Sequence, residues 1–186
     1  MYKDMLNTIY DNFEIRNEML ILTEVMNSTQ CEVDIDYYVP FTIKLGNRTS
    51  YTSKIYWRIG NFKNSLMEIS IDDKSGMLRD VTLISVDKAY LVNTTLQNIE
   101  PVENGMPVFL LDGNIQNGLY DYVMDFYVYL NIEFIMVNFS EECHPYKFVE
   151  LGRVRFGFDK DNRLISVIVK DLSGDEYSEL KDGLKL

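Results

Sequence analysis

The chain alternates apolar and polar residues on both sides of two acidic turns, and this pattern constrains its fold more than any other feature. In Met67–Ile71 apolar side chains alternate with polar ones, residues 72–76 have turn chemistry, and residues 78–86 favour β-structure again. Segment 154–158, turn 159–163 and segment 164–169 repeat this arrangement. Because successive side chains of a strand point to opposite faces, each unit is predicted to be a β-hairpin with one apolar face.

The two hairpins align with each other at an offset of 87 residues before the turn and 86 after it. The aligned pairs are Ile69 with Phe156, Ile71 with Phe158, Leu78 with Leu164, and Val81 with Val167. A weaker extension upstream sets Phe41 against Phe126. We therefore expect two structurally related halves, residues 1–92 and 119–186, joined by a crossover over 93–118 that is rich in Pro, Asn-Gly and Asp-Gly. The alternative is that any two hairpins with Asp-rich turns look alike.

The remaining periodicities predict an α+β fold of predominantly antiparallel β-sheet, with short N- and C-terminal helices, in a single domain or two packed halves. The further predicted elements are a helix within residues 1–13, strands at 31–37 and 54–59, one long strand over 120–136 with a bend near Asn131, and a terminal helix that ends near Gly183. Ser173 and Glu176 have the spacing of a capping box, which is typical of a helix start.

Composition and charge exclude several classes of protein. With 46% apolar and 13% aromatic residues, the chain can bury enough surface to fold, which excludes a disordered tail. Its 18 basic and 29 acidic residues give a net charge of −11, which repels nucleic-acid phosphates. The start lacks the pattern of a secretory signal, and three acidic residues interrupt the most apolar stretch, 119–139. We expect a cytoplasmic protein that does not enter a membrane.

Motifs for catalysis, cofactors or metals are weak throughout the chain. Asp159 opens a segment that begins like a calcium loop, but Arg163 occupies the third ligand position. Cys143 and His144 form the densest group of reactive side chains, yet neighbours on an extended chain point apart. We predict that Cys31 and Cys143 are free thiols, and that the chain is not an enzyme and binds no cofactor or metal.

An aromatic region in the second half is the predicted site for a partner. Tyr127 and Tyr129 are flanked by Asp121, Asp125 and Glu133, so aromatic anchors would be ringed by negative charge. Residues 93–186 hold 8 basic and 16 acidic groups, against 10 and 13 in residues 1–92. The alternatives are that the tyrosines fill the core and that the acids are solvent-exposed residues that keep the protein soluble and bind no partner.

The hairpin Met67–Leu78 and the small, acidic, strand-rich character of the chain resemble the cytosolic immunity proteins encoded beside bacterial polymorphic toxins. The resemblance implies a stoichiometric inhibitor that binds a toxin domain, often a basic one, and covers its active site or a neighbouring surface. A second hypothesis is a module for a small molecule or carbohydrate, with a cleft lined by tyrosines and Trp57. A third is a hydrolase that uses carboxylates or Cys143.

Overall fold

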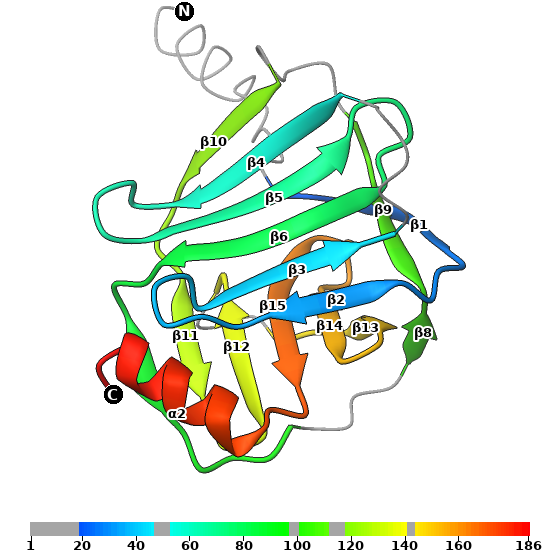
Figure 1. The fold of residues 1–186 in the computed structure, drawn as a ribbon. Coiled ribbons are helices and arrows are strands. Elements are labelled where there is room, and N and C mark those ends of the chain that lie inside the picture. Colours follow the sequence, from blue (N-terminus) through cyan, green and yellow to red (C-terminus); the bar gives the residue numbers. More distant parts are fainter. Residues whose placement is uncertain (1–18, 47–52, 97–100, 112–117, 141–143) are drawn as a thin grey trace, which may run out of the picture.

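A computed structural model describes residues 19–46, 53–96, 101–111, 118–140 and 144–186 (Figure 1). The predicted N-terminal helix lies outside these residues. The strands are β1 Leu22–Met26, β2 Cys31–Asp34, β3 Phe41–Leu45, β4 Lys54–Gly60, β5 Leu66–Asp72, β6 Leu78–Ser85, β7 Ala89–Leu91, β8 Val102–Asn104, β9 Met106–Phe109, β10 Leu119–Val123, β11 Tyr127–Leu130, β12 Phe134–Asn138, β13 Lys147–Leu151, β14 Val154–Phe158 and β15 Leu164–Lys170. Helix α2, Gly174–Gly183, follows β15.

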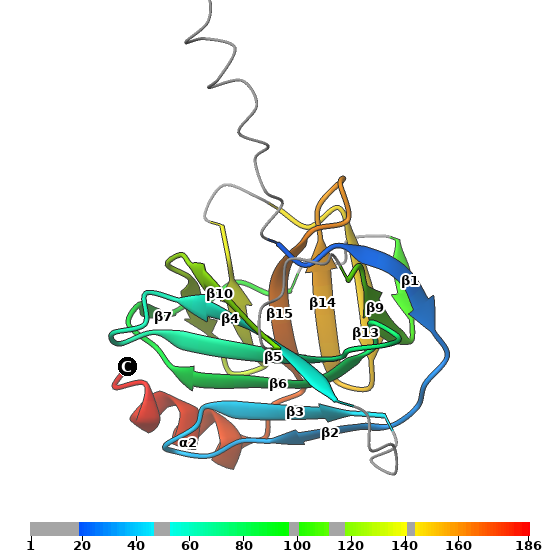
Figure 2. The same cartoon turned by 90° about the horizontal axis from the view of Figure 1, so that it is seen from above.

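Most strands belong to two sheets that pack face to face. The front sheet has the order β10-β4-β5-β6-β3-β2, and the back sheet has the order β7-β11-β12-β15-β14-β13-β8. Most neighbouring strands are antiparallel, whereas β10, β7 and β8 each run parallel to the strand they flank. In Figure 2 the strands β2, β3, β5 and β6 run across the view while β13, β14 and β15 run along it, so the two sheets cross. The predicted predominantly antiparallel β-fold is confirmed.

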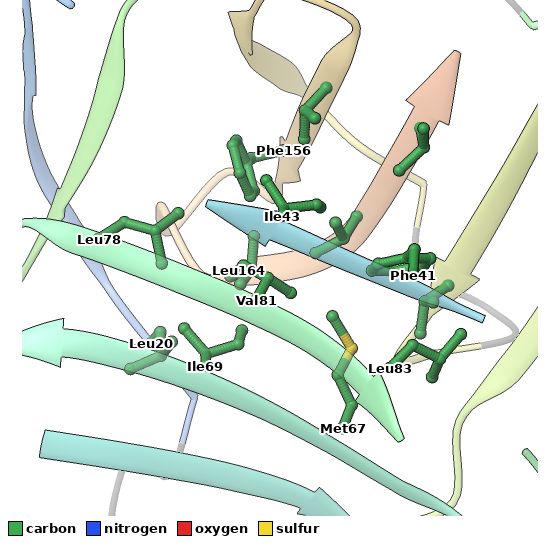
Figure 3. Close-up of a cluster of buried hydrophobic side chains, with 14 of the residues drawn as sticks. Leu20, Phe41, Ile43, Met67, Ile69, Leu78, Val81, Leu83, Phe156 and Leu164 are labelled. Atoms are coloured by element: carbon green, nitrogen blue, oxygen red, sulfur yellow. The ribbon is translucent and has the colours of Figure 1, made fainter. Parts of the chain in front are cut away.

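The inner faces of both sheets share one apolar core. Figure 3 shows side chains of β3, β5 and β6, such as Phe41 and Ile69, facing the same interior as Phe156 of β14 and Leu164 of β15. All four side chains are fully buried. The period of two in the sequence therefore places one face of every central strand in this core, as strand geometry requires.

Both predicted hairpins form, and they match in register. Ile69 lies opposite Val81 in the β5–β6 hairpin, and Phe156 lies opposite Val167 in the β14–β15 hairpin. Each ladder is irregular just before the turn, after Ser70 in the first hairpin and after Gly157 in the second. The sequence alignment of the two hairpins thus reproduces their pairing residue by residue.

An aspartate holds each hairpin turn. Asp72 Oδ1 accepts hydrogen bonds from the backbone N–H groups of Lys74, at 3.1 Å, and Ser75, at 2.9 Å. Asp159 Oδ1 accepts from the backbone of Asp161 and Arg163, both at 2.9 Å. In a tight turn some backbone N–H groups have no carbonyl partner, and these carboxylates accept their hydrogen bonds instead. This role accounts for the acidic residues of both turns without a bound cation.

The order of strands recurs in the two sheets. Strands β2 to β6 are arranged as β4-β5-β6-β3-β2, and strands β11 to β15 are arranged as β13-β14-β15-β12-β11, with every pair antiparallel. In this scheme β3, which contains Phe41, corresponds to β12, so the upstream alignment of Phe41 with Phe126 was wrong. A common origin of the two halves stays a prediction.

Strands β1 and β9 act as arms that connect the halves. The two arms pair antiparallel, with Leu22 opposite Phe109. The N–H of Leu22 donates to the carbonyl of Asn162 in the second hairpin turn, at 2.9 Å. The N–H of Phe109 donates to the carbonyl of Gly76 in the first hairpin turn, at 2.8 Å. Arm β1 of the first half therefore closes the second hairpin turn, and arm β9, in the crossover that leads to the second half, closes the first.

Two predictions about the middle of the chain need correction. The single strand over 120–136 is wrong, because residues 124–126 carry the chain from the front sheet to the back sheet. The turn at Asn131 is confirmed, since its N–H bonds the carbonyl of Phe134 at 2.9 Å. The turn interrupts the alternation of buried and outward-facing residues, so Ile132, although apolar, is exposed. The crossover 93–118 is not all loop, because it contains β8 and the buried arm β9.

Replacing Phe156 with alanine tests the shared core. Its side chain is fully buried among residues of both sheets, so the change removes contacts on both sides and leaves a cavity. We expect the free energy of unfolding in urea to fall by about 3–5 kcal/mol. The control Lys160→Ala, in the exposed turn of the same hairpin, should change it by less than about 0.5 kcal/mol. A loss below about 1 kcal/mol for Phe156→Ala would contradict this core.

Candidate functional site

The five residues predicted to bind a partner are distributed over elements of both sheets. Asp121 is on β10, at the edge of the front sheet, and it points away from the core. Tyr127 and Tyr129 are on β11 of the back sheet, where they alternate with buried residues and face away from the core. Asp125 lies where the chain passes between the sheets, and Glu133 lies in the β11–β12 turn.

Two of the predicted acids bind bases of the chain itself. Both oxygens of Asp121 accept hydrogen bonds from Arg58 of β4, at 2.7 and 2.8 Å. The amino group of Lys88 lies 2.8 Å from Asp125 Oδ2, and the hydrogen bond between them lowers the pKa of Asp125 and raises that of Lys88. These carboxylates are therefore largely neutralised, and they provide less steering charge than the sequence suggests.

Tyr127 and Tyr129 are half-buried against neighbouring side chains. The ammonium of Lys88 lies 4.9 Å from the ring centre of Tyr127. Tyr129 stacks on Tyr90 of β7, with ring centres 5.9 Å apart. The rings thus join an edge strand to the back sheet, and this structural role accounts for the aromatic density of the segment.

Glu133 belongs to a different cluster, which we call the α2 end. It consists of the β2–β3 loop (residues 35–40), the β11–β12 turn (131–133) and helix α2 (Figure 1). The carbonyl of Glu133 accepts from the N–H of Leu172, just before the helix, at 3.2 Å. Glu179 Oε1 accepts from the N–H of Tyr37 at 3.1 Å. The helix therefore contacts the β2–β3 loop of the front sheet, and the residue just before its cap contacts the β11–β12 turn of the back sheet.

Exposed apolar side chains stand out at the α2 end. Tyr38 is 82% exposed and Ile132 is 66% exposed. Tyr37 meets Tyr38 edge to face, with ring centres 5.1 Å apart. Large apolar groups with this exposure, on ordered turns, are typical of surfaces that bind other proteins.

The loop that carries Tyr38 is held in place from two directions. Asp36 Oδ1 accepts from the N–H groups of Tyr38, at 2.7 Å, and Val39, at 3.3 Å. Gly183, at the end of α2, packs so closely that a side-chain carbon there would lie 2.5 Å from the carbonyl oxygen of Tyr37. Because the loop is already ordered, binding through Tyr38 costs little further conformational entropy.

The charge of the α2 end is negative. Residues 35–40 and 131–133 contain one acidic and no basic side chain each, and residues 174–183 contain four acidic side chains and one basic one. The exposed acids include Glu133, Asp175 and Asp182. This end therefore combines the two properties that the sequence predicted for residues 121–133, an aromatic anchor and surrounding carboxylates.

Helix α2 is fixed to the back sheet by an ion pair and a cap. Arg153, in the β13–β14 turn, donates to Glu176 at 2.6 and 3.0 Å. The predicted capping box of Ser173 and Glu176 is confirmed, since each side chain bonds the backbone of the other. The hydrogen bonds from Arg153 lower the pKa of Glu176 to about 2.

The alternative chemistries find little support in the described part of the chain. Trp57 is almost fully buried between Phe139 and Tyr122, so no open cleft forms around it. A hollow of about 540 Å³ lies between Asn27–Thr29, Asn104–Gly105 and Glu150–Gly152, without an aromatic residue in its lining. Burial raises the pKa of the Cys31 thiol to about 11, which keeps it protonated at neutral pH.

The described residues also give little support to a metal site or to catalysis by Cys143 and His144. Within the described ranges, no group of three His, Cys, Asp or Glu side chains is placed to hold a metal ion. His144 is exposed, whereas Cys143 lies outside the described residues. The alternative in which this pair is catalytic is therefore not tested by the described residues.

No protein-family model matches the chain, and a search of curated proteins finds no match. Among the helices of the described residues, none has the length and apolar character needed to cross a bilayer. The functional argument therefore depends on the geometry of the surface.

Sequence patterns alone contained a partial signal for the α2 end. Asp36-Tyr37-Tyr38 follows an alternating strand and precedes Pro40, which indicates a turn with exposed aromatics. The position of this loop at the same end of the molecule as Glu133 and α2 depends on contacts between segments more than 90 residues apart in sequence. No local pattern predicts such contacts.

Replacing Glu176 with glutamine tests how α2 is anchored. The pKa of Glu176 falls from 4.5 to about 2 on folding, so the charged form stabilises the fold above pH 4.5 and this contribution disappears as the pH falls toward 2. We expect Glu176→Gln to lose about 1 kcal/mol of unfolding free energy near neutral pH. The difference in unfolding free energy between this variant and the unmodified chain should become smaller at acidic pH. Urea titrations at several pH values measure it. Glu24→Gln, on β1, serves as control. A pH-independent difference would contradict the ion pair.

Proposed function

We propose that the chain is a protein-interaction module that binds a basic partner through the α2 end. The observation that carries this proposal is Tyr38, 82% exposed on a loop whose backbone is held by the carboxylates of Asp36 and Glu179. Buried aromatic anchors dominate the affinity of many interfaces, and complementary charge accelerates encounter with the partner. The site thus moves from Asp121, Asp125, Tyr127 and Tyr129 to the α2 end, which retains Glu133.

The resemblance to immunity proteins suggests the biological form of this interaction. We propose an immunity-type inhibitor that meets a basic toxin domain in the cytoplasm and covers its active site or an adjacent surface. Such a role needs no catalytic residue and no cofactor in this chain. An acidic, preformed surface suits it, because a basic toxin domain would be attracted from a distance and held by groups that are already in place.

The repeated strand order supports a second proposal, that the two halves arose by duplication. Matching register in the hairpins, matching aspartate turns and reciprocal arms all follow from one unit used twice. The segments that follow the two hairpins differ, since β7 is a strand on β11 and α2 is a helix beside β2. Only the second half therefore supplies the helix on which the proposed binding surface is built.

Charge reversal at the α2 end tests the proposed surface. Glu133→Lys with Asp182→Lys changes two exposed acids, and it should weaken binding about tenfold or more at low ionic strength and reduce its salt dependence. Binding is measured by calorimetry against the proposed type of partner, a basic toxin domain from a neighbouring reading frame. The matched control, Glu24→Lys with Glu103→Lys, makes the same change of charge on β1 and β8 and should bind normally.

A result that favours the sequence-predicted site would overturn this location. Asp121→Lys with Asp125→Lys disrupts the pairs with Arg58 and Lys88 but leaves the α2 end intact. If that variant folds and loses the partner while the α2-end variant binds normally, the surface lies on β10 and the segment after it.

Removal of the Tyr38 ring tests the anchor directly. Tyr38→Ala should weaken partner binding about 10- to 30-fold, as expected for an anchor worth about 2 kcal/mol. The melting temperature should change little, because the ring is 82% exposed. Tyr146→Ala removes another exposed tyrosine, away from the α2 end, and should leave the affinity unchanged. Equal affinities for the two variants would rule out Tyr38 as the anchor.

A further inference from the structure

Among the described residues, no strand lies beside the outer edge of β10, so that edge presents a row of backbone groups. Strand β10 is the last strand of the front sheet, and among the described residues only β4 pairs with it. The carbonyl of Gly118 accepts from Tyr56 at 2.8 Å, and the N–H of Met124 donates to Gly60 at 3.2 Å. Since alternate residues of a parallel strand face the same neighbour, Tyr120 and Tyr122 also bond β4, and the residues between them face outward.

The side chains of these outward-facing residues leave the edge poorly protected. Val123 is 74% exposed and Leu119 is 44% exposed. Natural edge strands avoid pairing with other molecules mainly through charged side chains, prolines or bulges. The one charge here, Asp121, is bound through both oxygens by Arg58 of the adjacent strand. Its charge is therefore balanced by Arg58 within the sheet, and it repels an approaching strand only weakly.

We propose that β10 of one copy pairs antiparallel with β10 of a second copy, about a twofold axis at Asp121. In that register the outward groups meet outward groups: Leu119 faces Val123 of the second copy, Asp121 faces its equivalent, and Val123 faces Leu119 of the second copy. These are the three hydrogen-bonded pairs of an antiparallel ladder. The two front sheets then form one continuous sheet.

The strand is self-complementary in side chains as well as in backbone. At each end of the pairing, exposed Leu119 covers exposed Val123, so both apolar groups leave water together. At the axis the two Asp121 carboxylates meet, each already neutralised by its own Arg58. The chain uses the same device internally, where the arms β1 and β9 pair antiparallel.

The size of the contact sets the expected strength of the dimer. Stable interfaces bury on the order of 1,200 Å² or more, and a pairing of two five-residue strands is smaller than that. We therefore expect a reversible dimer, with the chain monomeric at ~10 µM and substantially dimeric near ~1 mM in sedimentation experiments. The α2 end lies elsewhere on the molecule, so this dimer is independent of the proposed partner surface.

Amide hydrogen exchange followed by NMR tests the proposal on the unmodified chain. In a monomer, the N–H groups of Tyr120 and Tyr122 are protected by β4, whereas those of Leu119, Asp121 and Val123 exchange quickly. In the dimer, the latter three become protected as well. We expect their exchange to slow at least tenfold between ~10 µM and ~1 mM, while that of Tyr120 and Tyr122 stays constant. Exchange that does not depend on concentration would overturn the proposal.

Variants of the edge separate β10 pairing from other association. Val123→Lys places a charge on the edge, and Val123→Pro removes an N–H that has no role in binding β4, so both should keep the fold and abolish the dimer. Ile84→Lys adds the same charge at an exposed position of β6 and should dimerise normally. Glu133→Lys with Asp182→Lys should also dimerise normally, even if it loses the basic partner. A dimer that survives both Val123 variants, or protection of the edge only when a basic protein is added, would refute self-pairing.

Discussion

Burial of two apolar sheet faces against each other is the constraint on which the rest of this structure depends. The side chains of Phe41, Ile69 and Phe156 have no contact with water, and they come from strands that cross in the two sheets. Because the centre of the molecule is filled in this way, polar and exposed groups are left for the turns, the sheet edges and the outer faces. The surfaces available for function are therefore the ends and edges of the sandwich, as at the α2 end and at β10.

Charge shows how far composition can mislead about a surface. The excess of acids in the second half suggested an electronegative face, but Asp121 and Asp125 bind Arg58 and Lys88, which come from the first half. Both pairs join residues far apart in sequence: the first depends on β10 lying beside β4, and the second on the segment before β7 lying beside β11. At the α2 end Glu176 is also paired, with Arg153, so the negative charge of that end comes mainly from the exposed acids Glu133, Asp175 and Asp182.

Local features of the fold were predictable, and pairings between distant segments were not. Alternation and aspartate turns predicted both hairpins, and the capping box of Ser173 predicted α2, since each of these depends on residues close in sequence. The division of residues 120–136 between two sheets was missed because apolar alternation does not reveal which sheet receives a strand. Arm β9 was missed because Gly105 and Pro107 resemble loop residues, although an edge pair tolerates both. Of the five residues predicted to bind a partner, Glu133 is the one that lies at the proposed α2 end, and its neighbours there come from segments far away in the chain.

The exchange of arms between the halves has a consequence for how the molecule comes apart. The turn of the first hairpin is completed by β9, and the turn of the second by the residues at the start of β1. If the chain were cut between the halves, the hairpin turn of each fragment would lose its hydrogen bond to the arm of the other. Each fragment would also keep an arm whose partner strand lies in the other fragment. Such fragments are mutually dependent, so the two should recombine when mixed, and neither half can lose its structure without weakening the other.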